Sequence, residues 1–159
     1  MDKISFRFAS REDVPLILQF IKDLADYEKL LHEVVATEEI LAEWLFEKNK
    51  AEVIFALEEE KEVGFALFFH NFSTFLGRAG IYLEDLFVLP QYRGKGYGKA
   101  LLEKLGAIAV ERGCGRLEWW VLDWNKPSID FYRSMGAVPM DEWTVFRIDG
   151  ETLEKMGRK

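Results

Sequence analysis

Hydrophobic and polar residues alternate along this chain in two periods, and the changes of period divide it into elements. A period of two, typical of a strand with one buried face, begins at Ile4, Phe6 and Phe8. The same period or a short apolar run predicts strands over residues 4–8, 52–57, 63–72, 79–88, 116–122, 138–140 and 143–148. Helical spacing of apolar residues predicts helices over residues 14–28, 37–45, 101–109, 125–136 and 151–157. This mixture predicts an α/β fold.

Length and charge restrict the kind of protein this can be. The chain has 159 residues, of which 49% are hydrophobic, enough for one full core. No repeat, linker or low-complexity tract divides it, which predicts one domain over residues 1–159. The net charge of −7 argues against a nucleic-acid partner, because phosphate contacts require clustered lysine and arginine. An acidic surface favours cationic partners, although solubility alone also accounts for it.

The cysteine and hydropathy patterns indicate a compartment. The single cysteine, Cys114, excludes an internal disulfide and is compatible with a reducing environment. The first residues do not resemble a secretory signal, and no apolar run approaches the roughly 20 residues that span a bilayer. We therefore expect a soluble, cytoplasmic protein without a membrane partner. His32 and His70 do not have metal-ligand spacing, so no metal site is expected.

A glycine-rich turn, Arg93-Gly94-Lys95-Gly96-Tyr97-Gly98-Lys99, stands between a predicted strand and a predicted helix. Successive backbone amides at a helix start can bind an anion, and the helix dipole strengthens the binding. The turn therefore predicts a ligand with phosphate groups. A Walker A motif is excluded, because Arg93 stands where its first glycine belongs and Ala100 where its hydroxyl residue belongs. The dinucleotide-binding motif is excluded because its third glycine would have to lie one residue after Gly98.

The turn matches the acetyl-coenzyme A signature Gln/Arg-x-x-Gly-x-Gly/Ala and resembles that of the GNAT superfamily. Further stretches resemble its spermidine/spermine (diamine) N-acetyltransferase branch, namely Arg7 to Glu28, Tyr82-Leu83-Glu84-Asp85-Leu86-Phe87-Val88, Trp124 to Tyr132 and Gly136-Ala137. The resemblance covers nearly the whole chain. It implies a mixed, mostly antiparallel sheet of about seven strands flanked by helices. It also implies an acetyl-CoA-dependent N-acetyltransferase that forms a homodimer.

The resemblance further implies residue roles. Glu84 is expected to accept the amine proton, directly or through water, and Tyr132 to protonate the departing thiolate. Strand alternation places Glu84 and Asp85 on opposite faces, which predicts different roles for these carboxylates. Arg93 and Lys95 are expected to add positive charge near the phosphates. Acetyl-CoA is expected to contact Leu86, Phe87, Val88, Arg93, Gly94, Lys95, Gly96, Tyr97, Gly98, Lys99, Asn125 and Ser128.

The substrate is expected to be a small-molecule amine bound in a channel of carboxylates and aromatic rings, suited to a polyamine or a thialysine-like diamine. The channel residues would be Tyr27, Glu28, Glu84, Asp85 and Glu142. Two alternatives stay open. A protein or peptide N-acetyltransferase would need an open groove for a backbone. A non-catalytic acyl-CoA-binding sensor would need the glycine turn but neither Glu84 nor Tyr132.

Overall fold

The computed structural model describes residues 4–158, and the chain divides into two compact units. The first unit ends at Trp120 and the second begins at Val121. The expectation of one domain over residues 1–159 stays a prediction, because the two units are defined separately. Within residues 4–158, no helix is both long and apolar enough to cross a membrane.

One five-stranded sheet forms the centre of the first unit, and its strands follow each other in chain order. They are β1 (Ile4–Phe8), β2 (Glu52–Glu58), β3 (Lys61–Ser73), β4 (Arg78–Val88) and β5 (Leu117–Trp119). Neighbouring strands from β1 to β4 run antiparallel, and β5 runs parallel to β4. The prediction of a mixed, mostly antiparallel sheet is confirmed.

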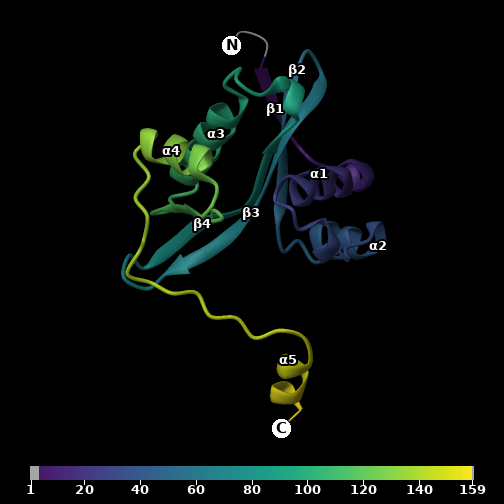
Figure 1. Ribbon diagram of the computed structural model, residues 1–159, viewed down its shortest axis with the longest axis vertical. Helices are drawn as coiled ribbons and strands as arrows, with labels where there is room; N and C mark the ends of the chain where they lie inside the picture. Colours follow the sequence, from purple (N-terminus) through teal and green to yellow (C-terminus); the bar gives the residue numbers. More distant parts are fainter. Residues whose placement is uncertain (1–3, 159) are drawn as a thin grey trace. The chain divides into compact units, whose positions relative to one another are not determined.

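Helices cover both faces of this sheet. The long helices are α1 (Val14–Tyr27) and α3 (Tyr97–Glu111), and α2 (Glu38–Leu41) continues as a π-helical segment, Ala42–Glu47. Short 3-10 turns lie at Arg11–Asp13, Leu31–Glu33 and Pro90–Tyr92. Figure 1 shows α1 and α2 on one side of the sheet and α3 on the other.

An aromatic core holds α1 against the sheet. Ile17 and Phe20 of α1 are at most 2% exposed, and they pack with Phe55 of β2 and Phe65 of β3. The ring centres of Phe20 and Phe65 are 5.0 Å apart. Burying side chains of this size contributes roughly 1.5–3 kcal/mol each. The core therefore fixes the C-terminal end of α1, where Tyr27 and Glu28 lie.

The second unit corrects the expected strand number. Its helices are α4 (Lys126–Ser134) and α5 (Gly150–Gly157). The strands predicted over residues 138–140 and 143–148 are not formed, so the sheet has five strands and not about seven. Trp143 and Phe146 are 74% and 92% exposed. A strand is stable only when neighbours satisfy its backbone and cover one face, and no described strand pairs with this segment.

The last strand of the sheet is also shorter than expected. The prediction of a buried strand over residues 116–122 is wrong in length, because β5 spans only Leu117–Trp119 and is half-buried. Trp120, which follows it, is 57% exposed. The apolar run therefore continues past the point where β4 offers it a hydrogen-bonding partner.

Candidate active site

The glycine-rich turn joins the end of β4 to the start of α3. Gly94 and Gly96 have φ values of +78° and +89°, in the left-handed region that glycine adopts most easily. The amide of Ala100 donates to the carbonyl of Gly96 at 3.0 Å. The amides of residues 97–99 lie ahead of this bond and have no helical carbonyl one turn earlier. This is the arrangement of an anion-binding helix start.

Open space lies in front of the turn. A Cβ atom added at Gly94 or Gly98 would meet no protein atom within 4 Å. Gly98 is helical, so neither its conformation nor its protein neighbours require glycine. A ligand that approaches the backbone closely would require it. The turn therefore fits a pyrophosphate group held by main-chain amides.

One edge of β4 is free beside the turn. β5 pairs with β4 only from Ile81 to Leu83, so no described strand covers this side of β4 from Glu84 onward. On the other side, Leu86 and Val88 pair with β3. An extended ligand with amide groups can bind such an edge as an added strand. The amide-containing pantetheine arm of acetyl-CoA has this character.

The side chain of Arg93 braces the start of the turn. Its Nε donates to the carbonyl of Val88 at 3.0 Å. Its guanidinium carbon lies 4.9 Å from the ring centres of both Tyr27 and Phe87. Lys95 lies 5.2 Å from the ring centre of Tyr92. Both cations are therefore close to the turn, and Arg93 links it to the end of α1.

A β-bulge shapes the carboxylate end of β4. Leu83 of β4 lies opposite Phe68 of β3, and Asp85 lies opposite Leu67. Phe68 and Leu67 are consecutive, whereas Leu83 and Asp85 are separated by one residue. Glu84 is the extra residue of the bulge. The bulge turns Asp85 to the face that carries Leu67 and α1, and it breaks the alternation used in the sequence prediction. The two carboxylates nonetheless differ, because Glu84 is exposed and Asp85 is half-buried.

Three carboxylates influence one another at this bulge. Burial, Glu84 and Glu28 together raise the pKa of Asp85 to about 7. Burial and the charge of Glu84 also raise the pKa of Glu28, which caps the C-terminal end of α1. Like charges held this close resist ionising together, and a bound cation relieves the repulsion. The cluster therefore suits a substrate with a positive charge.

Aromatic rings stand next to the carboxylates. Tyr27 and Phe87 form an edge-to-face pair with ring centres 6.4 Å apart. Tyr82 contacts the ring of Trp120 at 6.0 Å, and burial followed by the charge of Glu84 raises the pKa of Tyr82. Trp120 and Tyr82 are absent from the predicted site. The position of Tyr82 two residues before Glu84 is the signal that could have indicated it.

The remaining predicted residues belong to the second unit. Asn125 is 6% exposed, and its side chain accepts a hydrogen bond from the amide of Ser128 at 3.4 Å, which caps α4. Tyr132 is half-buried one turn later, with its ring centre 5.6 Å from that of Phe131. Glu142 is exposed in the segment that was expected to form strands. That these residues face the glycine turn and the carboxylates stays a prediction.

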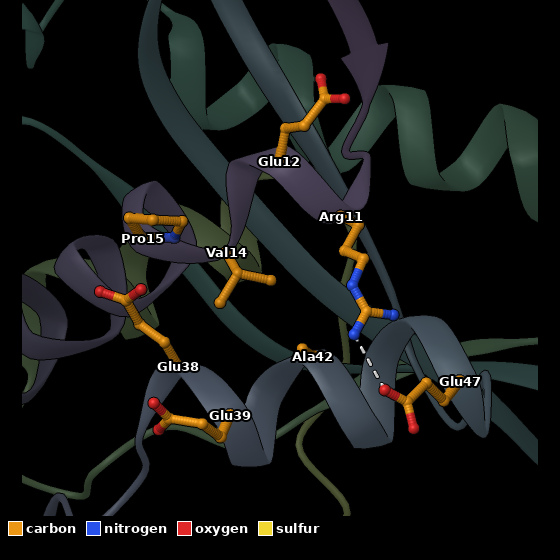
Figure 2. Close-up of a pocket in the computed structure, with 8 residues that line it drawn as sticks. All are labelled: Arg11, Glu12, Val14, Pro15, Glu38, Glu39, Ala42 and Glu47. Carbon is orange, nitrogen blue, oxygen red and sulfur yellow. Dashed lines mark hydrogen bonds and ion pairs between the residues drawn. The ribbon is translucent and has the colours of Figure 1, made fainter.

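A separate open pocket of about 490 Å³ lies between the start of α1 and α2. Figure 2 shows its lining, in which Arg11 forms a 2.9 Å ion pair with Glu47. Glu38 and Glu39 occupy the first turn of α2, where carboxylates are favoured by the helix dipole. The pocket shares no residue with the predicted site. Within residues 4–158, no group of three or more histidine, cysteine, aspartate or glutamate residues is arranged to hold a metal ion.

Comparison with known proteins identifies the class. The family model described as "Acetyltransferase (GNAT) family" matches residues 18–137. A thialysine N-epsilon-acetyltransferase of Bos taurus is 37% identical over 168 residues, which cover 98% of each chain. A human spermidine/spermine N(1)-acetyltransferase-like protein 1 is 32% identical over 98% of this chain and 24% of its own length.

A solved structure agrees with the fold. An integron cassette protein from the mobile metagenome of V. cholerae superposes with a TM-score of 0.82, at 30% identity and over 99% of each chain. The chain therefore belongs to the GNAT acetyltransferase family. It is an N-acetyltransferase, and acetyltransferases of this family use acetyl-CoA as co-substrate. The resemblance seen in the sequence is confirmed.

Proposed function

We propose that this enzyme transfers the acetyl group of acetyl-CoA to a primary amine of a small diamine or polyamine, with both substrates bound together. The observation that carries the proposal is the cluster of Glu28, Glu84 and Asp85 at the bulge of β4, next to the free strand edge and the glycine turn. The amine and the thioester can therefore meet at one place on β4.

The carboxylates support a substrate with a second positive charge. Thialysine and spermidine, which appear in the names of two relatives, both carry more than one amino group. One amine reacts in its neutral form while another stays protonated. Glu28 and Asp85 would bind the protonated amine, because its charge offsets the repulsion that raises their pKa values. Tyr27 would supply an aromatic wall for the alkyl chain or the cation.

Proton transfer would use one group for each substrate. Glu84, which is exposed, would accept the proton that the reacting amine loses, directly or through a water molecule. The amine nitrogen bonds to the thioester carbon, and the carbon–sulfur bond breaks. Tyr132 would give its phenolic proton to the departing thiolate. The products are an N-acetylated amine and free CoA.

Acetyl-CoA would be held mainly by the glycine turn and the end of β4. The amides of residues 94–99 would bind the pyrophosphate, with Lys95 and Arg93 contributing positive charge nearby. The free edge formed by Leu86, Phe87 and Val88 would pair with the pantetheine arm. Asn125 and Ser128, at the start of α4, would contact its far end. We extend the proposal to Glu142, which would contribute a further carboxylate to the amine site.

We also propose a cytoplasmic homodimer. The exposed apolar side chains of residues 138–148 support an assembly, because apolar surface of this extent is ordinarily covered. The single cysteine, Cys114, leaves no internal disulfide to be lost in a reducing compartment. Sedimentation analysis tests the dimer, and a monomer at all concentrations would contradict it.

Release of CoA thiol from acetyl-CoA tests the proposed function. Spermidine, spermine, putrescine, thialysine, lysine and a short peptide would be compared at equal concentrations. The proposal predicts the highest kcat/KM for an extended diamine or polyamine. Turnover with the peptide alone would indicate a peptide acetyltransferase, and tight acetyl-CoA binding without any turnover would indicate a sensor.

A further inference from the structure

Tyr97 is buried at the first position of α3, in the middle of the glycine-rich turn signature. Its side chain is 1% exposed. Its hydroxyl group donates a hydrogen bond to Oε1 of Glu58, the last residue of β2. The partners are 39 residues apart in the chain. This contact joins the start of α3 to the hairpin between β2 and β3.

The surroundings keep this hydrogen bond in place. The ring centres of Tyr92 and Tyr97 are 6.4 Å apart, in an edge-to-face arrangement. Burial and the bond to Glu58 raise the pKa of Tyr97 to about 12, so the phenol stays a donor at every pH of interest. A buried hydroxyl group that lost its acceptor would destabilise the folded protein. The hydrogen bond therefore fixes the position of Tyr97 more closely than packing alone would.

The turn needs such a contact because its glycines add conformational freedom. Gly94 and Gly96 both lie in the left-handed region, and a glycine-rich segment loses more entropy on ordering than other segments do. Arg93 braces the side of the turn next to β4 through Val88. Tyr97 is the corresponding contact on the α3 side. The side chains of Arg93 and Tyr97 bond to other protein groups and not to the main-chain amides of the turn. Those amides therefore stay available to a ligand.

We propose that the Tyr97–Glu58 hydrogen bond positions the first turn of α3 so that the amides of residues 97–99 converge on the pyrophosphate of acetyl-CoA. Tyr97 and Glu58 are positioning residues and not catalytic ones. The inference rests on the proposed function, since it assumes that the glycine turn is the acetyl-CoA site. It adds Glu58, which lies between two predicted strands and is not among the predicted site residues.

The test compares Tyr97→Phe, Glu58→Ala, Glu58→Gln and the double variant Tyr97→Phe/Glu58→Ala. We expect Tyr97→Phe and Glu58→Ala each to raise the Kd and KM for acetyl-CoA about tenfold. The double variant should have the same Kd as the single variants, because both substitutions remove one hydrogen bond. The kcat and the KM for the amine should stay unchanged. Glu58→Gln keeps an acceptor oxygen and should restore most of the affinity. Glu60→Gln, an exposed carboxylate in the same hairpin, is the control for the change of charge.

The outcomes separate this inference from the proposed function. A lowered Tm for Tyr97→Phe with unchanged acetyl-CoA affinity would overturn the positioning role and leave only a structural contact. Gly98→Ala, measured by calorimetry alongside, reports on the turn itself. Weaker binding in Gly98→Ala but not in Tyr97→Phe would overturn the inference alone. Unchanged binding in both variants would overturn the assignment of the glycine turn as well.

Discussion

The guanidinium group of Arg93 lies 4.9 Å from the ring centre of Tyr27, so the glycine turn and the end of α1 are in direct contact. Tyr27 is next to Glu28, a member of the carboxylate cluster. The proposed acetyl-CoA site and the proposed amine site therefore share a structural element. A substitution at Arg93 should therefore change the binding of both substrates.

Arg93→Gln should raise the KM for acetyl-CoA and the KM for the amine together. The variant loses the planar cation over both rings, contacts worth about 1–2 kcal/mol. We expect a several-fold increase in each KM. The free energy of unfolding, measured in urea, should fall by about 1–2 kcal/mol. Arg11→Gln removes an equal charge from an exposed ion pair with Glu47 and serves as the control. An Arg93→Gln enzyme with both KM values unchanged would contradict the link.

Gly98→Ala should make the protein more stable but its acetyl-CoA binding weaker. The position is helical and has free space for a methyl group, so the substitution should stabilise α3 by up to about 1 kcal/mol. The same methyl group would occupy the space in front of the turn. Gly106→Ala, also in α3 and equally unobstructed, should show the gain in stability alone. Thermal unfolding and calorimetry distinguish the two variants. Equal affinities of both variants for acetyl-CoA would argue against pyrophosphate binding at the glycine turn.

Glu84→Gln should lower kcat by about 10²–10⁴ while the Kd for acetyl-CoA stays the same, because the amide cannot accept the amine proton. The loss should be smaller at alkaline pH, where more of the amine is already neutral. Steady-state rates from pH 7 to pH 10 check this. A wild-type kcat at pH 7 would rule out Glu84 as the base.

Asp85→Asn should remove a pH dependence of stability. The pKa of Asp85 is raised from 3.8 in the unfolded chain to about 7 in the fold, chiefly by burial. Between these values the folded protein holds a proton that the unfolded chain releases, so this group lowers stability as pH rises to about 7 and not beyond. The free energy of unfolding of the variant should exceed that of the wild type by about 4 kcal/mol at pH 8 and by little at pH 4. Urea unfolding at several pH values measures the difference, and a constant gap would contradict the assignment.

Local sequence pattern predicted most of the first unit. The strands β1 to β4 and the helices α1 and α3 follow directly from the spacing of residues that the structure buries, such as Ile17, Phe55, Phe65 and Leu101. Two segments with the right spacing, residues 138–140 and 143–148, do not form strands. Periodicity reports which face of a segment is apolar, whereas a strand also needs a neighbouring backbone.

Details of the site depend on contacts that spacing cannot reveal. The bulge at Glu84 is set by the register of β4 against β3, and local propensity does not encode it. The hydrogen bond between Tyr97 and Glu58 joins distant parts of the chain. The sequence therefore gives no sign that the end of β2 and the glycine turn meet, although the side chain of Tyr97 connects them.

The central claim is that the carboxylates at the bulge select an amine with a second positive charge. The most direct test compares kcat/KM for cadaverine and for n-pentylamine, which have the same chain length and differ by one terminal amine. We predict that the wild type favours cadaverine by at least about tenfold, and that Asp85→Asn and Glu28→Gln reduce this preference. Equal use of the two amines by the wild type would contradict the account.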